Sequence, residues 1–275
     1  MACAFFVAAR RGSISAEVLC NPRVAYAVAA EARSALDPWS GDFPHSVVHA
    51  AAWREEAREL AAELLNLPGS SWWTQGLNRE AQVLVAGPQP PDQLGQIAGR
   101  ELLSSAYVQS ARDLTISATN HQGDSCWEVF ADRHLGDVDP VPGPHRTLLQ
   151  ISPQARIYEI HAASDWQRLV HDFPLAGSED SRGGLAPDWG LVAQRWDGVH
   201  LSFAGLLGTT YAGFERAEPD FDLDEPGSVL WTWDREQTRW LGDVITAGAE
   251  IPAPDRSARV SFAGPLLTDL QGGGT

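Results

Sequence analysis

The sequence predicts an α+β fold, in which a helical N-terminal part is followed by a mixed β-sheet with short helices. Apolar residues recur at helical spacing through most of the segment 22–65. Short apolar segments separated by Asn, Gly and Asp clusters follow, which is typical of an antiparallel or mixed sheet rather than repeated βαβ units. The chain has 275 residues, 44% of them hydrophobic, which is enough to bury a sizeable core.

The N-terminal part is expected to begin with a strand over residues 4–8 and to continue as two helices. Asn21 predicts the start of the first helix, because its side-chain oxygen can accept from free backbone N–H groups and Pro22 suits the first helical position. The second helix is expected from residue 46 and should end at residues 66–69, Asn-Leu-Pro-Gly.

The middle of the chain alternates short strand-like segments with turn residues. The expected strands are residues 81–87, 105–110, 113–119 and 126–132. The stretch GDVDPVPGPH that follows is the most linker-like of the chain. We therefore divide the chain into residues 1–145, a helical part with short strands, and residues 146–275, a Trp-rich α+β part.

The C-terminal part is expected to form a sheet with two short helices. The expected strands are residues 156–161, 198–203, 228–233 and 259–264, of which the first three should be adjacent in space. Ser164 and Gln167 form a capping-box pattern for one helix, and Asp188 is expected to cap the other. Residues 234–241 are expected to be a turn or a short helix.

Six of the eleven tryptophans lie between residues 166 and 240. Tryptophan is large and amphipathic, so this concentration predicts either an aromatic-walled cleft or an unusually heavy core. A cleft requires that at least two of four side chains be partly accessible to solvent, namely Trp189, Trp196, Trp231 and Trp233.

The charged residues exclude several functions. All twenty basic residues are arginine, so Schiff-base chemistry and a P-loop lysine are impossible. Pyridoxal-phosphate enzymes and ordinary P-loop NTPases are thereby excluded. The formal net charge of −16 argues against binding to a phosphate backbone, so no nucleic-acid partner is expected.

We expect a cytoplasmic protein that does not enter the membrane. Its three cysteines, Cys3, Cys20 and Cys126, include no CxxC pair, which fits a reducing compartment better than a disulfide scaffold. The N-terminus does not have the pattern of a signal peptide, and no apolar run reaches the length of a membrane span.

No metal site is predicted, although two groups of residues contain possible metal ligands. Four possible zinc ligands lie within twenty-five residues, at spacings that match no structural zinc motif: His121, Cys126, His134 and His145. The acidic segment 215–225 resembles a calcium loop, but Glu225 stands where an EF-hand needs its turn glycine. A solvated acidic loop is the simpler interpretation.

Three residues on or just after successive predicted strands suggest a type of reaction. Arg156 lies on one strand, Ser202 ends the next, and Glu236 follows a third. This order resembles the Arg, Ser, Glu plan of ADP-ribosyltransferases. The resemblance implies NAD as co-substrate, with Arg156 binding its phosphates, Ser202 bracing the nicotinamide pocket and Glu236 orienting the ribose. Tyr211 or Trp231 would form the aromatic wall for nicotinamide.

A second resemblance covers residues 156–241, with their phrases PDW, WDGVHLS and WDREQTRWL. This stretch is similar to the ends of uncharacterised proteins from high-GC Gram-positive bacteria, which imply no activity. Within it, His200 alternates with Val199 and Leu201 on a predicted strand. If those two face the core, His200 faces the other side, near Ser202, and is a candidate catalytic residue.

Two hypotheses remain open. The first is a small-molecule transferase of the ADP-ribosyl kind, which uses NAD together with Arg156, His200, Ser202 and Glu236. The second is a noncatalytic binding or accessory protein whose Trp-lined surface takes a hydrophobic small molecule or a partner protein. The sequence does not determine the oligomeric state.

Overall fold

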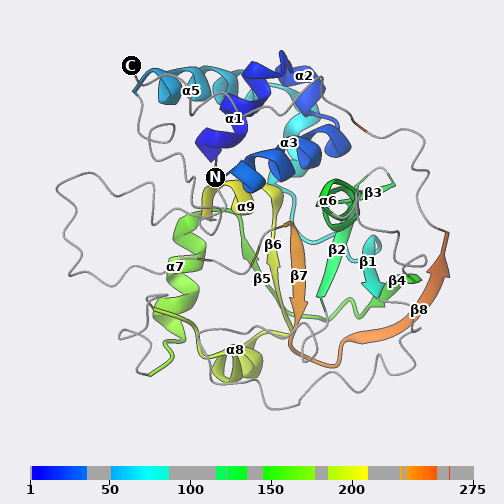
Figure 1. Ribbon diagram of the computed structural model, residues 1–275. Coiled ribbons are helices and arrows are strands. Elements are labelled where there is room, and N and C mark those ends of the chain that lie inside the picture. Colours follow the sequence, from blue (N-terminus) through cyan, green and yellow to red (C-terminus); the bar gives the residue numbers. More distant parts are fainter. Residues whose placement is uncertain are drawn as a thin grey trace.

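The computed structural model describes residues 2–35, 51–86, 116–121, 123–134, 145–176, 185–209, 230, 233, 235–252 and 260. It has an α+β architecture with a helical N-terminal part followed by a mixed sheet, which confirms the predicted fold class (Figure 1). No helix in these ranges combines the length and the apolar character needed to cross a membrane.

Helices dominate the first third of the chain and then alternate with strands. The helices are α1 (Ala2–Arg11), α2 (Ala16–Leu19), α3 (Pro22–Ala35), α5 (Ala51–Leu65), the 3₁₀ helix η1 (Pro68–Thr74), α6 (Cys126–His134), α7 (Ala163–Asp172), α8 (Trp189–Arg195) and α9 (Phe203–Thr209). The strands are β1 (Gln82–Ala86), β2 (Ile116–His121), β3 (Asp124–Ser125), β4 (His145–Ile151), β5 (Ile157–Ile160), β6 (Gly198–Leu201), β7 (Gln237–Trp240) and β8 (Ile245–Ile251).

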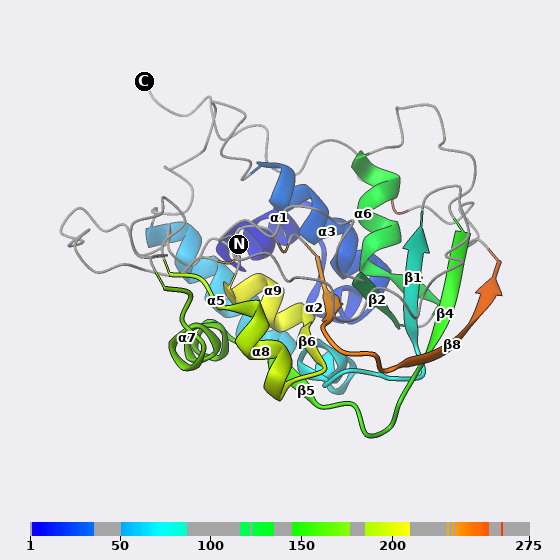
Figure 2. The same cartoon turned by 90° about the horizontal axis from the view of Figure 1, so that it is seen from below.

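The strands form one mixed sheet. Its order is β5-β6-β7-β2-β1-β4-β8, with β3 paired to β2. β5 and β6 are parallel, and the other pairs are antiparallel. Seen from below, β5 and β6 lie near α7 and α8, and β4 and β8 form the far end (Figure 2). Because β1 pairs with β4 and β2 with β7, the boundary proposed at residue 145 falls within a single sheet.

The predicted helix starts at Asn21 and Asp188 are confirmed. The Oδ1 atom of Asn21 accepts hydrogen bonds from the backbone N–H groups of Arg23 and Val24, at 3.0 and 3.4 Å. Asp188 caps α8 in the same way, with its Oδ1 atom 2.8 Å from the Gly190 nitrogen. For α7 the capping prediction was wrong, because Asp165 rather than Ser164 accepts from the free N–H groups at the start of that helix.

Two predicted strands are helices in the structure. Residues 4–8 lie in α1, and all five of their side chains are buried; an apolar run of that length cannot be assigned by periodicity alone. Residues 126–132 lie in α6, which the Ser125 side chain caps. The Ser125 hydroxyl donates to Glu128 Oε2 at 2.7 Å and accepts from the Glu128 N–H at 3.3 Å.

The third strand beside β5 and β6 is β7, residues 237–240, and not residues 228–233 as predicted. Leu230 and Trp233, the described residues of that segment, lie outside any strand. All four residues of β7 are buried, so the segment lacks the polar and apolar alternation of a half-exposed strand. Val260 also lies outside a strand, and the expected strand at 105–110 falls outside the described residues.

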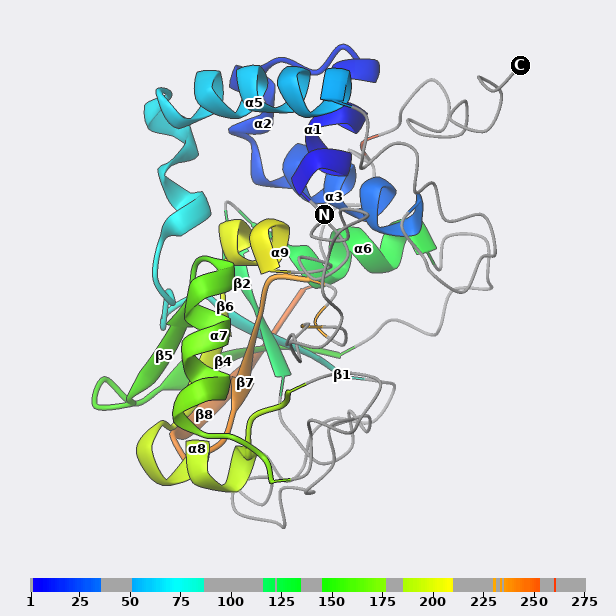
Figure 3. The same ribbon diagram turned by 90° about the vertical axis from the view of Figure 1, so that its left-hand side faces the viewer.

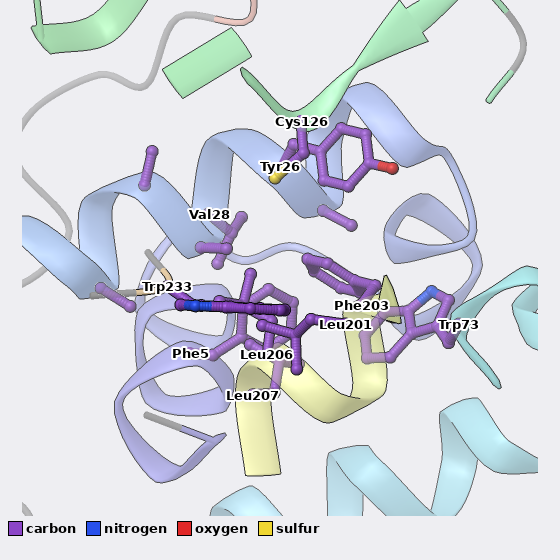
Figure 4. Packing of buried hydrophobic residues seen from close by; sticks show 14 of the residues in the cluster. Phe5, Tyr26, Val28, Trp73, Cys126, Leu201, Phe203, Leu206, Leu207 and Trp233 are labelled. Carbon is purple, nitrogen blue, oxygen red and sulfur yellow. The ribbon is translucent and has the colours of Figure 1, made fainter. Parts of the chain in front are cut away.

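The N-terminal helices stack above one end of the strands, and α9 lies between these helices and the sheet (Figure 3). Phe203 of α9 is fully buried and forms the centre of this junction (Figure 4). Its ring centroid lies 5.8 Å from that of Phe5, 5.4 Å from that of Tyr26 and 4.8 Å from that of Trp73. Such aromatic pairs add about 0.5–1.5 kcal/mol each beyond their buried area.

The C-terminal tryptophans contribute mainly to the core. Trp166, Trp189, Trp233 and Trp240 are all buried. Trp196 is partly exposed, and Trp231 lies outside the described residues. The heavy-core interpretation therefore holds for four of the six, and an aromatic cleft would depend on the remaining two.

Candidate functional site

One face of the sheet carries a row of polar side chains across four adjacent strands. In the register of the sheet, Glu159 of β5 pairs with His200 of β6, His200 with Thr238 of β7, and Thr238 with Ser117 of β2. Directly paired residues project from the same face of a sheet, so these four side chains share one surface.

The row of polar side chains continues at the strand ends nearest the N-terminal helices. His161 directly follows β5, Ser202 directly follows β6, Glu236 directly precedes β7, and His121 ends β2. Side chains alternate between faces along a strand, so residues two apart share a face. The polar face therefore collects what we call the His–Glu cluster, namely His121, Glu159, His161, His200 and Glu236.

Glu236 is held by two distant segments. Its side chain is 1% exposed. The Tyr26 hydroxyl of α3 donates to Oε2, and His121 Nε2 lies 3.1 Å from Oε1. Burial, together with the neighbouring Glu236, raises the pKa of Tyr26 well above its ordinary value, so the phenol stays protonated as a donor. A carboxylate has about four lone-pair sites, so Glu236 retains acceptor capacity for a ligand hydroxyl.

Ser202 and His161 form a second pair beside Glu236. The Ser202 Oγ atom lies 3.0 Å from His161 Nδ1 and 3.2 Å from the Ile160 carbonyl oxygen. The hydroxyl also accepts from the Gly205 N–H at 3.2 Å, at the start of α9. Its single proton can go to the carbonyl oxygen or to the imidazole, so the tautomer of His161 decides which of the two is bonded.

His200 is buried and neutral. Its Nδ1 atom lies 3.0 Å from the Thr238 hydroxyl, which donates its own proton to Gln82 Oε1, also at 3.0 Å. Thr238 must therefore accept from His200, which places the imidazole proton on Nδ1 and leaves a lone pair on Nε2. Burial, with His161 and His121 nearby, lowers the pKa of His200 to about 3.

A hydrogen-bonded network fixes this face of the sheet. Gln82 accepts from Ser117 at 2.7 Å and donates to the Thr119 hydroxyl at 2.9 Å. Trp240 Nε1 in turn donates to Ser117 Oγ at 2.9 Å. A fully connected buried network of this kind holds its members in fixed rotamers.

Glu159 is the least satisfied member of the His–Glu cluster. Its Oε1 atom accepts from the Leu77 N–H at 3.0 Å, whereas Oε2 is buried and has no hydrogen-bond partner in the described part of the chain. Burial raises the pKa of Glu159 to about 7, and the negative charge of Glu236 contributes to the same direction. The Glu159 carboxyl is therefore close to half protonated at neutral pH.

Arg156 does not lie with Ser202 and Glu236. Its guanidinium forms a bidentate pair with Asp197, with Nε 3.0 Å from Oδ2 and Nη2 3.0 Å from Oδ1, before β5 and β6 begin. Ser202 lies after the opposite end of β6, which is about 13 Å away for four residues at roughly 3.3 Å each. Tyr211 and Trp231 fall outside the described residues.

Of the four possible zinc ligands, His121 and Cys126 are the two whose side chains the structure describes. His121 contacts Glu236, and Cys126 is a buried thiol that forms no disulfide with another described cysteine. Within the ranges that the structure describes, no three His, Cys, Asp or Glu side chains are placed to hold a metal ion. The acidic segment 215–225 lies outside those ranges.

Comparisons with protein-family models, with curated proteins and with solved structures find no match for this chain. The interpretation of the site therefore depends on its own geometry.

Of the residues on this face, the sequence indicates Ser202, His200 and Glu236 as candidates and His121 only as a possible zinc ligand. It does not indicate Tyr26, Glu159 or His161. The signal was present for the last two, because Glu159 and His161 alternate on one strand as His200 and Ser202 do on the next. Only the parallel pairing of β5 with β6 shows that Glu159 and His161 lie on the same sheet face as His200 and Ser202. For Tyr26 no local signal exists, because it lies 210 positions before Glu236.

Proposed function

We propose that the protein is a small-molecule transferase that cleaves NAD between nicotinamide and ribose, with Glu236 as its catalytic carboxylate. The observation that carries the proposal is the buried Glu236 carboxylate, which Tyr26 and His121 hold beside the Ser202–His161 pair. Three of these groups, His161, Ser202 and Glu236, flank the adjacent strands β5, β6 and β7, which is the strand order that the resemblance to ADP-ribosyltransferases implies.

The proposed chemistry uses the negative charge of Glu236. When the glycosidic bond breaks, its electron pair leaves with nicotinamide, which departs neutral, and positive charge develops on the ribose. A preorganised carboxylate that accepts from a ribose hydroxyl stabilises that charge in a water-poor site. An acceptor hydroxyl or water then bonds to the ribose carbon and loses its proton to solvent or to a neighbouring base.

In this proposal His161 supplies the β5 residue of the site, in place of Arg156. His161 lies 3.0 Å from Ser202, whereas the guanidinium of Arg156 is occupied by Asp197. His200 serves as a positioning residue, because its Nδ1–H bond to Thr238 joins the site to the Gln82 network.

The second candidate function is a noncatalytic binding or accessory protein. It is favoured by the burial of Ser202 and Glu236, which are at most 1% exposed, as a purely structural polar cluster would be. The partly exposed Trp196 would then belong to the ligand surface.

The test measures nicotinamide release and thermal stabilisation by NAD. We expect wild-type protein to be stabilised by millimolar NAD and to release nicotinamide. Glu236→Gln should keep the stabilisation and lower release by about a hundredfold or more. Glu63→Gln, which changes an exposed glutamate of α5, should retain both. A wild-type protein that NAD neither stabilises nor reacts with would support the binding-protein function instead.

A further inference from the structure

Arg239 is a buried cation on the face of β7 opposite Thr238. It is 3% exposed, although it lies in the middle of the sheet between β6 and β2. Its guanidinium carbon lies 5.3 Å from the ring centroid of Trp189 and 5.1 Å from that of Trp233. The two indoles are nearly parallel, at 10°, with centroids 6.1 Å apart.

The N–H donors of this guanidinium have no hydrogen-bond acceptor among the described residues. Arginine has five N–H donors, and an ionised group taken out of water needs partners for its charge. In the described part of the chain Arg239 makes no ion pair and its side chain makes no hydrogen bond, and its Nε atom is fully enclosed without an acceptor. The cation–π contacts offset only about 2 kcal/mol of the desolvation cost.

Among the described residues, none supplies a charge that shifts the pKa of Arg239. Burial lowers the pKa of Arg239 to about 10, and no neighbouring charged group contributes to that change. The guanidinium is still protonated at neutral pH. In the described part of the chain, one unneutralised positive charge therefore lies against two stacked indole rings.

We propose that Arg239, Trp189 and Trp233 form a binding site for the carboxylate group of a small molecule. A planar guanidinium presents parallel N–H donors that match the two oxygens of a carboxylate. A single positive charge matches a monoanion, whereas a phosphate dianion would need further donors in a protein of net charge −16. This site lies on the sheet face opposite the His–Glu cluster and does not depend on the proposed NAD chemistry.

The test titrates the ¹⁵N-labelled full-length protein with sodium acetate at constant ionic strength and follows the tryptophan indole N–H resonances. We expect saturable shifts at Trp189 and Trp233, and none at Trp72 and Trp73, which pack in the helical layer. Sodium chloride and inorganic phosphate at matched ionic strength should shift these two resonances at least tenfold more weakly than acetate.

Arg239→Gln should weaken acetate binding at least tenfold. Arg195→Gln is the matched control, because Arg195 also lies over an indole, 5.8 Å from the centroid of Trp196, but on the exposed side of α8. The proposal is overturned if wild-type Trp189 and Trp233 show no saturable shift, or if chloride or phosphate acts as strongly as acetate. If Arg239→Gln does not fold, the wild-type titration alone decides between these outcomes.

Discussion

At the scale of single residues, Glu159 shows how burial converts a common side chain into a pH-dependent one. Its pKa in the folded protein is about 7, above the ordinary 4.5 of an exposed glutamate. Below pH 4.5 the carboxyl is protonated in both the folded and the unfolded state. Between pH 4.5 and 7 the unfolded state loses the proton first, so the free energy of unfolding falls as the pH rises.

Glu159→Gln should remove this pH dependence, because the amide stays neutral and can still accept from the Leu77 N–H. The free energy of unfolding of the variant, relative to wild type, should rise between pH 5 and pH 8 by up to about 3 kcal/mol. Urea titrations at the two pH values measure it, with the exposed Glu80→Gln as control. If wild type and variant lose stability in parallel over this range, Glu159 is an ordinary carboxylate.

The hydrogen bond from Tyr26 to Glu236 should contribute more to stability than an ordinary tyrosine bond. Tyr26→Phe removes a donor from a buried carboxylate and should cost about 1.5–3 kcal/mol. Tyr158→Phe is the matched control, because it removes a 2.7 Å bond to the neutral carbonyl of Asp165 and should cost about 1 kcal/mol. If urea titrations show that both variants lose the same free energy of unfolding, the bond from Tyr26 to Glu236 contributes no more than a bond to a neutral carbonyl.

At the scale of elements, the sequence predicted those whose ends carry side-chain caps, such as α3 at Asn21 and α8 at Asp188. The Ser125 cap that begins α6 was also readable, but the β-prone residues after it favoured a strand. β7 could not be assigned in this way. Its residues are buried on both faces by segments far away in the chain, which no local pattern encodes.

The contact of α9 with β5 depends on a glycine. A Cβ atom at Gly205 would lie 2.1 Å from the Ile160 carbonyl oxygen, which no rotamer can relieve, whereas one at Gly208 would meet nothing within 4 Å. Gly205→Ala should therefore destabilise the protein by about 1–3 kcal/mol or more. Gly208→Ala should stabilise it by up to about 1 kcal/mol, because alanine favours the helix. A Gly205→Ala melting temperature equal to wild type would contradict this packing.

At the scale of the whole molecule, the candidate site is assembled from both halves of the sequence. Tyr26 and His121 lie before residue 145, and Ser202 and Glu236 lie after it. The sequence alone could place Ser202 at a strand end, because turn and strand signals are local, but it placed Glu236 after a strand at 228–233 and not before β7. It could not bring them to Tyr26, since that contact depends on how the helical layer packs on the sheet.

The same arrangement predicts how the molecule unfolds. One sheet joins strands from both sides of residue 145, and one hydrophobic core extends from Phe5 of α1 to Trp233. Residues 1–145 and 146–275 expressed separately should therefore not fold, since each would expose its half of the core. Calorimetry of the full chain should show a single transition that coincides with those followed by circular dichroism and tryptophan fluorescence.

Phe203→Ala tests this cooperativity at the junction of α9 with the N-terminal helices. Removing a fully buried aromatic ring should lower the free energy of unfolding by about 3–5 kcal/mol. Calorimetry, circular dichroism and tryptophan fluorescence should all show the same decrease in the midpoint of thermal unfolding, because the helical layer and the sheet share that ring. Leu191→Ala, which changes an exposed side chain of α8, should shift the midpoint little. Two separable transitions, with Phe203→Ala moving only one of them, would show that the helical layer and the sheet are independent folding units.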